Sequence, residues 1–333
     1  MKKTLYIVLF FILWLDLNSF SQQLTYAEKL GYPKNSRLLI LHVDDAGMSY
    51  DSNLGVETAL DKGIANSCSI MMPCPWVPDF MHYLKLHPNT DAGLHLTLTS
   101  EWKEYRWGPV SGKSQVPGLV DQEGDLWPDV ADVVKHASPD EVEKEINAQL
   151  NRSLSMGWKP THLDAHMGAI FSTPAFIQRY VKLGIENKIP VMFPGGHSTL
   201  IKKQMNIGET QMQMMHAVGE QLWAAGLPVL DDLHNESYDW QIPKEIAIDT
   251  NKLKDFKTEK YILAIKSLKP GITMMIMHCT EPSEIFARIS DSGPIRKGDL
   301  LAMLNPVLKA EIAKEGIILV TWRELMDKRS KVK

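Results

Sequence analysis

Residues 160–168 read PTHLDAHMG and place three metal-capable side chains at alternate positions: His162, Asp164 and His166. Imidazole nitrogens and carboxylate oxygens are common ligands of divalent metals. If the segment is a strand, alternation puts all three side chains on one face. If it is a helix, only His162 and His166, four residues apart, share a face. Pro160 and the shortness of the apolar run favour the strand.

The chain around this segment alternates short apolar runs with helical patterns. Runs that are apolar almost throughout, such as LLILHV and ITMMIM, are typical of strands covered on both faces. Ser138-Pro139 begins a predicted helix over residues 140–156, and Thr173-Pro174 begins another that extends toward Asn187. The predicted strands are residues 38–43, 65–72, 92–98, 161–166, 189–193, 227–230, 272–277 and 317–320.

Alternation of strand and helix predicts an α/β fold with a parallel sheet and right-handed crossovers. About eight strands indicate a single-domain, irregular (β/α) barrel that resembles a TIM barrel. An open doubly wound sheet is the alternative, although no G-x-G-x-x-G follows the first run.

Polar side chains gather where the predicted strands end, which is where barrel enzymes carry their chemistry. Asp44 and Asp45 close the first run, His95 lies near the end of the third, and His278 closes the seventh. Each of these residues alone is explained as well by a helix cap or a buried histidine. Together with the HLDAH segment they form a constellation in which one carboxylate and two imidazoles make an open metal site.

Residues 99–128 are too long for a simple connection and are rich in Trp, Gly and Pro. We expect a functional insertion over one face of the barrel. Its aromatic residues Trp102, Tyr105 and Trp107 are suited to stacking on the apolar face of a sugar ring. Packing of the insertion against the barrel explains them equally well.

The N-terminal stretch MKKTLYIVLFFILWLDLNSFSQQ has the layout of a secretory signal peptide over residues 1–21. Its apolar run is about half the ~20 residues that a membrane span needs, and an uncleaved anchor is the alternative. We therefore expect an exported protein, periplasmic or extracellular, with no stable membrane span after cleavage. The formal net charge of -4 gives no indication of nucleic-acid binding. The three cysteines, an odd number, are expected to be buried free thiols.

Four blocks of the chain resemble, in order, those of the YdjC-like carbohydrate deacetylases, which include chitooligosaccharide deacetylases. HVDDAGMS resembles the DDFG opening of that family, and GIANSCSIM, GLHLTLT and PTHLDAH resemble its next three blocks. The resemblance implies an irregular (β/α) barrel over residues 22–333, a divalent metal, and hydrolysis of an N-acetyl group from a sugar. Asp45, His95 and His166 match the family's metal ligands, and Asp44 matches its catalytic base. His278 stands where a late histidine would serve as the acid.

Two departures from the family pattern lie at the edge of the expected site. HMGAIF replaces a histidine-rich stretch, with Gly168 where a histidine is common, and Cys279 replaces the proline that usually follows the late histidine. Neither departure removes a proposed ligand. Both change the edge of the site, so the substrate can differ from that of the best-known members.

The chemistry expected of these residues is amide hydrolysis. A divalent ion would activate a water molecule, Asp44 would accept its proton, and His278 would protonate the leaving amine. Asp164 would orient one of the histidines beside it through the free ring nitrogen, and His162 is explained equally well as structural. Mg and Zn are the favoured metals, while Mn, Co and Ni stay open. The sequence names neither the sugar nor the oligomeric state, so a homo-oligomer stays open.

Three other functions remain open at this point. Two histidines and a carboxylate also describe non-haem iron oxygenases, which usually have a β-sandwich scaffold. A metal-dependent phosphoesterase would need a basic cluster for phosphate, and the motifs contain none. A sugar-binding protein without catalysis would have no need of Asp44 beside the metal.

Overall fold

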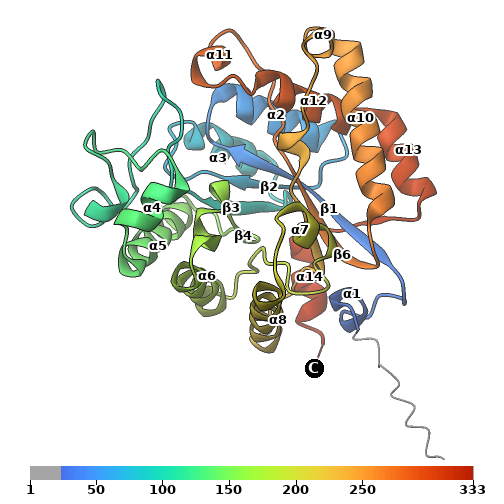
Figure 1. Ribbon diagram of the computed structural model, residues 1–333, viewed down its shortest axis with the longest axis horizontal. Coiled ribbons are helices and arrows are strands. Elements are labelled where there is room, and N and C mark those ends of the chain that lie inside the picture. Colours follow the sequence, from blue (N-terminus) through green and yellow to red (C-terminus); the bar gives the residue numbers. More distant parts are fainter. Residues whose placement is uncertain (1–23, 333) are drawn as a thin grey trace, which may run out of the picture.

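A parallel β-sheet of seven strands forms the centre of the described residues, 24–332, in this computed structural model, and helices surround it (Figure 1). The strand order is β4-β3-β2-β1-β6-β5, and β7 also pairs with β1. The strands are β1 (Arg37–Ala46), β2 (Ser67–Ile70), β3 (Ala92–Leu96), β4 (Leu163–Ala165), β5 (Asp232–His234), β6 (Gly271–Met277) and β7 (Ile318–Leu319). The signal peptide predicted over residues 1–21 lies outside the described residues.

The sheet is open between β4 and β5, so it forms a half-barrel and the prediction of a barrel holds only in part. The predicted strands over residues 189–193 and 227–230 are wrong as regular strands. They contribute only the isolated bridges Leu163 to Val191 and Pro194 to Leu230. Pro190 and Pro228 interrupt these two segments and Pro194 follows the first, and a proline cannot donate a ladder hydrogen bond. The segments therefore follow the path of a barrel without closing it.

Several helices begin at a side-chain cap. The two predicted helices are confirmed as α5 and α6, and α5 starts with a capping box between Ser138 and Glu141. Among the described residues, no helix is long and apolar enough to cross a membrane. The α-helices are α1 (Tyr26–Lys29), α2 (Tyr50–Asp61), α3 (Val77–Leu86), α4 (Val130–His136), α5 (Pro139–Ser155), α6 (Pro174–Asn187), α7 (Thr199–Gln204), α8 (Glu209–Ala224), α9 (Lys244–Ala247), α10 (Thr250–Ser267), α11 (Phe286–Ile289), α12 (Gly293–Met303), α13 (Pro306–Lys314) and α14 (Trp322–Arg329). Three 3-10 helices are η1 (Pro117–Leu119), η2 (His166–Ser172) and η3 (Ser237–Asp239).

The core lies along β1 and β6, which are adjacent in the sheet. Every residue of β6 is buried, and so is every residue of β1 after Arg37. Apolar side chains on both faces of these strands explain their unbroken hydrophobic sequences. Cys68, Cys74 and Cys279 are free and buried, as expected.

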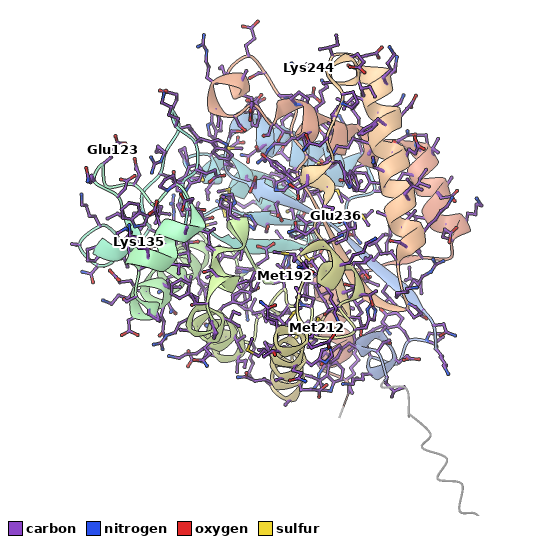
Figure 2. All side chains as sticks on the ribbon, viewed as in Figure 1. Glu123, Lys135, Met192, Met212, Glu236 and Lys244 are labelled. Carbon is purple, nitrogen blue, oxygen red and sulfur yellow. The ribbon has the colours of Figure 1, made fainter. Side chains whose placement is uncertain are left out.

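The insertion over residues 99–128 lies beside the carboxyl end of β1. It is irregular apart from η1 and one antiparallel bridge, Val120 to Leu126, and Glu123 marks its outer part in Figure 2. The hydroxyl of Tyr105 donates a hydrogen bond to the carbonyl oxygen of Met48 over 2.5 Å, just after β1. On the other side, the Glu145 carboxylate of α5 accepts hydrogen bonds from backbone amides of the insertion. The insertion is thus fastened over the sheet edge where the candidate residues end.

Candidate metal centre and active site

The end of β1 brings two neighbouring carboxylates into one site. Successive residues of a strand normally point to opposite faces. Here the register of β1 against β2 shifts between Val43 and Ala46, and Asp45 has a φ of 69°. Aspartate tolerates this left-handed conformation better than most residues, and such backbone strain is common at functional sites. The irregularity directs both Asp44 and Asp45 toward the histidines.

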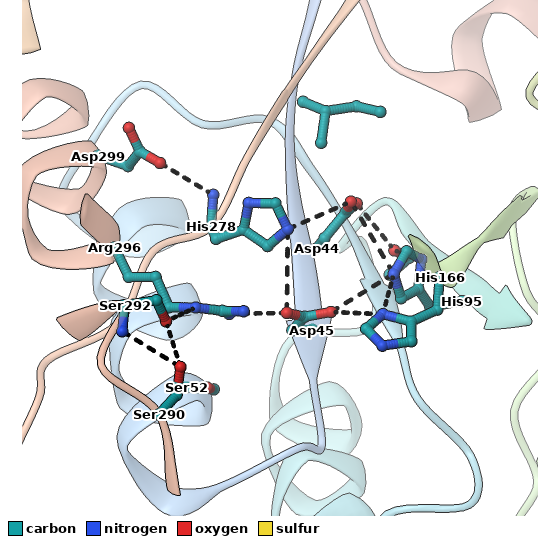
Figure 3. A network of polar contacts seen from close by, with 12 residues as sticks. Asp44, Asp45, Ser52, His95, His166, His278, Ser290, Ser292, Arg296 and Asp299 are labelled. Atoms are coloured by element: carbon teal, nitrogen blue, oxygen red, sulfur yellow. Dashed lines mark hydrogen bonds and ion pairs between the residues drawn. The ribbon is translucent and has the colours of Figure 1, made fainter. Parts of the chain in front are cut away.

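Three candidate metal-ligand atoms, one each from Asp45, His95 and His166, lie close together near the carboxyl ends of three strands (Figure 3). Asp45 Oδ1 lies 3.4 Å from His95 Nε2 and 3.3 Å from His166 Nδ1. The two histidine nitrogens are 3.3 Å apart. All three side chains are nearly inaccessible to solvent. These are the residues that the sequence resemblance matches to metal ligands.

The donor set fits a divalent ion. Ligands at ~2.1 Å from a tetrahedral metal lie roughly 3.4 Å from one another, which agrees with the three separations. Asp45 Oδ1 is buried and has no hydrogen-bond partner among the described residues, so this oxygen is an acceptor open to a cation. Burial alone would raise the pKa of Asp45, but the Arg296 guanidinium and the nearby histidines hold it well below its ordinary value. The carboxylate is therefore ionised and ready to bind a cation.

Each of the three candidate metal ligands also contacts a second polar group, on the side that faces away from the other two ligands. His95 Nδ1 lies 2.8 Å from Asp164 Oδ1, and Asp45 Oδ2 accepts a hydrogen bond of 2.7 Å from Arg296 of α12. His166 Nε2 lies 3.0 Å from a carboxylate oxygen of Glu101, in the insertion. Such outer contacts fix which ring nitrogen carries the proton and which is free to bind a metal.

Asp164 contacts a different histidine from those expected. The sequence suggested that it orients His162 or His166, its neighbours in the chain. Instead it faces His95 on β3, because β4 pairs with β3 in a register that sets Asp164 opposite His95. His162 Nε2 is 3.9 Å from the other Asp164 oxygen, and His166 turns toward Glu101.

Asp44 lies beside the three donors and keeps one oxygen turned toward His278. Its Oδ1 is 3.1 Å from Nε2 of the buried His42 and accepts a hydrogen bond of 3.4 Å from Ser69. Its Oδ2 is 3.9 Å from both His95 Nε2 and His278 Nε2. Burial would lower the pKa of His42, but the carboxylates of Asp164 and Asp44 raise it to about 9. The His42 ring thus contacts both carboxylates, at 3.1 Å from Asp44 Oδ1 and 2.8 Å from Asp164 Oδ2.

His278 follows β6 and is fixed through its backbone. Its amide donates a hydrogen bond of 3.2 Å to Asp299, which also forms a fully buried ion pair of 2.7 Å with Lys257. The ring meets Tyr238 edge to face at 5.0 Å. Burial lowers the pKa of His278 below its ordinary value, and the charge of Arg296 lowers it further. Both effects favour the neutral form of the imidazole.

His162 has the surroundings of a structural residue. Its ring is fully buried and stacks on Trp322 with a centroid distance of 5.1 Å. A Cβ added at Gly93 would fall 2.3 Å from His162 Nε2, so the ring fills the space that this glycine leaves. Burial lowers the pKa of His162 well below its ordinary value. Of the two explanations left open for His162, packing fits these contacts.

The two tryptophans of the insertion differ in what they offer to a ligand. Only 4% of Trp107 is exposed, and its indole N–H donates to the carbonyl oxygen of Thr99 over 2.9 Å. The expectation that Trp107 stacks on a sugar is therefore wrong, because packing leaves it no open face. Trp102 is half-buried, and the Arg296 guanidinium lies 5.8 Å from its ring centre. Stacking of a sugar on Trp102 stays a prediction.

The sequence analysis did not predict three residues of the site: Glu101, Arg296 and His42. Glu101 follows the GLHLTLT block by only two residues, so a carboxylate that close to His95 was a usable signal. His42 also had one, since it is two residues before Asp44 on a buried strand. Arg296 had none, because it lies 251 residues from its partner Asp45.

The chain is similar along most of its length to known proteins. A family model described as "YdjC-like protein" matches residues 38–314. A carbohydrate deacetylase of Brevibacillus brevis is 30% identical over 245 residues, which cover 70% of this chain and 94% of that protein. A carbohydrate deacetylase of Thermus thermophilus is 27% identical over 303 residues, covering 90% and 97%.

The fold has a solved counterpart as well. A crystal structure from Enterococcus faecalis V583, described as a candidate cellobiose-phosphate cleavage protein, superposes with a TM-score of 0.68. It is 20% identical, and the match covers 87% of this chain and 99% of that one. The family match, the ordered sequence blocks and the shared α/β half-barrel agree, and this chain belongs to the YdjC-like family.

Proposed function

We propose that this protein is a carbohydrate deacetylase that uses one divalent ion to hydrolyse N-acetyl groups of a sugar or oligosaccharide. The observation that carries the proposal is the convergence of Asp45, His95 and His166 at 3.3 to 3.4 Å, with Asp44 beside them and outside the donor set. The names of the curated relatives support deacetylation of carbohydrate. Mg and Zn are the proposed ions, with Mn, Co and Ni as alternatives.

Asp45, His95 and His166 would hold the ion. When bound, a divalent cation lowers the pKa of a water ligand and polarises the carbonyl oxygen of the acetyl group. The remaining steps belong to the side chains around it. Asp44 Oδ2 accepts the proton that water loses as its oxygen attacks the carbonyl carbon. His42 and Ser69 hold the other oxygen of Asp44, so the carboxylate keeps its orientation.

His278 completes the proton transfer. Its Nε2 lies 3.9 Å from Asp44 Oδ2, so the proton that Asp44 gains can pass to the imidazole as the groups close in. The lowered pKa of His278 then makes its imidazolium a ready donor to the departing nitrogen. The C–N bond breaks, and the products are acetate and the free amine. One water is consumed, and Asp44 and His278 return to their starting states.

The signal peptide predicted from the sequence adds a location to this proposal. An exported deacetylase would act on glycans in the periplasm or outside the cell. The departures at Gly168 and Cys279 lie next to His166 and His278, so they would affect which sugar is accepted. Gly168 has a φ of 66°, which glycine adopts without strain.

The experiment is a measurement of acetate release. Purified protein restored with Zn²⁺, Mg²⁺ or Mn²⁺ is incubated with N-acetylglucosamine oligomers of increasing length, with O-acetylated xylan, and with phosphate monoesters. Acetate and free amine in equal amounts from the N-acetylated sugars support the proposal. Phosphate release instead would support a phosphoesterase. Saturable sugar binding without turnover would support a binding protein.

A further inference from the structure

His166 is contacted by a carboxylate on the side of the ring that faces away from the other donors. Its Nε2 lies 3.1 and 3.0 Å from the two carboxylate oxygens of Glu101. Its Nδ1 faces Asp45 Oδ1 and His95 Nε2, each at 3.3 Å. When a carboxylate holds the Nε2–H of an imidazole, the lone pair remains on Nδ1, the nitrogen that faces the candidate metal position.

We infer that Glu101 is a positioning residue for His166, and that the insertion over residues 99–128 raises metal affinity by holding Glu101 in place. This inference rests on the proposed metal site. It assigns Glu101 no contact with substrate or with the ion. Its effect acts through His166, whose ring it orients and whose basicity it increases.

The segment that carries Glu101 is fixed from two directions. The Ser100 hydroxyl oxygen accepts hydrogen bonds from the Trp107 amide at 3.0 Å and from Arg106 Nε at 3.2 Å. The Ser100 amide donates to the carbonyl oxygen of Trp127 at 2.9 Å. The residue before Glu101 is therefore tied to both the beginning and the end of the insertion.

Arg106 connects these ties to the far part of the insertion. Its Nη2 donates to Asp121 Oδ2 and to the carbonyl oxygen of Leu126, each at 2.7 Å. The buried Trp107 adds a hydrogen bond to Thr99 and lies near the His166 ring, with a centroid distance of 6.4 Å. These contacts give Arg106 and Trp107 a common role, which is to immobilise the backbone around Glu101.

Burial makes the Glu101–His166 contact strong. Exposed side-chain fractions are 5% for His166 and 19% for Glu101, so water competes little for the hydrogen bond. The exposed Glu104 belongs to the same segment, and its one ion-pair partner within residues 24–332 is Lys103, at 3.9 Å. It carries the same charge without contacting the site, which makes Glu104→Gln a matched control.

The test measures metal affinity directly, without substrate. Metal-free wild type, Glu101→Gln, Glu101→Ala and Glu104→Gln are titrated with Zn²⁺ and with Mn²⁺ against a competing chelator. Loss of an outer carboxylate of this kind weakens metal binding by about 10- to 100-fold. We expect a loss of this size for Glu101→Ala and a smaller one for Glu101→Gln, which keeps an acceptor oxygen. Glu104→Gln should bind as wild type does.

A second variant separates positioning from folding. Arg106→Gln leaves Glu101 in the chain but loosens the segment that holds it, so its affinity should fall in the same direction while its thermal unfolding midpoint without metal shifts little. Affinities of Glu101→Ala and Arg106→Gln within twofold of wild type would overturn the inference and leave the proposed function standing. Wild type that binds neither ion would overturn both.

Discussion

The carboxylates of Asp44 and Asp45 both lie 3.9 Å from Nε2 of His278, although the two residues are neighbours on one strand. The register shift in β1 and the positive φ of Asp45 produce this arrangement. Asp45 turns one oxygen to His95 and His166 and the other to Arg296, whereas Asp44 faces His42 with one oxygen and His95 and His278 with the other. This arrangement fits the proposed division of roles, in which Asp45 would hold the ion and Asp44 would accept a proton.

Asn substitutions of these two residues should therefore have different consequences. Asp44→Asn should keep one ion per chain and lose turnover by about 10²- to 10⁴-fold, the usual contribution of a general base. Asp45→Asn should lose the ion itself. Metal content after gel filtration and the kcat for acetate release check both. Equal metal loss in the two variants would contradict the division of roles.

The proposed role of His278 as the acid can be tested by comparing two substrates whose leaving groups differ in their need for a proton. His278→Gln should lower kcat strongly for an N-acetylated sugar, because an amine must leave protonated. The loss should be small for 4-nitrophenyl acetate, whose phenolate leaves without a proton. His82→Gln, an exposed histidine on α3, is the control and should change neither rate. Equal losses on the two substrates would argue against proton donation by His278.

The buried pair of Lys257 and Asp299 should dominate local stability. Both side chains are fully buried, and Lys257 also donates to the carbonyl oxygen of Ser237 over 2.8 Å. Lys257→Met leaves Asp299 as an uncompensated charge, so it should lower the free energy of unfolding by about 3–5 kcal/mol. Denaturant unfolding monitored by circular dichroism measures this. Lys182→Met removes an exposed ion pair with Glu143 and should leave the midpoint unchanged.

His234 should make the fold sensitive to acid. Burial lowers the pKa of His234 from an ordinary 6.5 to about 4, so the folded protein disfavours the charged ring. Its contribution to stability is fully present above pH 6.5 and is lost as the pH falls toward 4. At about 1.4 kcal/mol per pKa unit, the total is about 3 kcal/mol.

His234→Leu should flatten the stability profile between pH 6.5 and 4, as measured by unfolding at a series of pH values. His216→Gln, on the exposed face of α8, should keep the wild-type slope. An unchanged slope in His234→Leu would show that other groups cause the acid sensitivity.

The sequence predicted those parts of the fold that depend on local pattern. The continuous apolar runs became β1 and β6. The middle of the HLDAH segment, Leu163–Ala165, became β4, whereas His166 begins η2. Closure of the barrel was not predictable in the same way. Residues 189–193 and 227–230 have apolar patterns, but the ladder depends on backbone N–H groups that their prolines lack.

The candidate site shows the same difference between what a local pattern predicts and what depends on tertiary contacts. The candidate ligands stand near strand ends, where residue type and position carry information, so the constellation could be recognised from the chain. The choice of Asp45, His95 and His166 within it came from the family resemblance. The side chains that contact these ligands could not be predicted from the sequence, because each contact depends on how distant segments pack together. Arg296 of α12 donates a hydrogen bond to Asp45, and the register of β4 against β3 places Asp164 opposite His95. The role of Trp107 could not be decided from the sequence, because its residue type is equally suited to stacking and to packing; in the structure it is buried.

The proposed metal-dependent deacetylation is tested most directly by titrating metal into the stripped protein while its activity is measured. Wild type and His166→Ala are stripped of metal, and Zn²⁺, Mg²⁺ or Mn²⁺ is returned in steps of a fraction of an equivalent while acetate release from an N-acetylated oligosaccharide is followed. We expect no release without metal, a rise that levels off at one ion per chain for the active metal, and no rise in His166→Ala. Full activity in stripped wild type, or a normal rise in His166→Ala, would show that deacetylation does not depend on an ion held by His166.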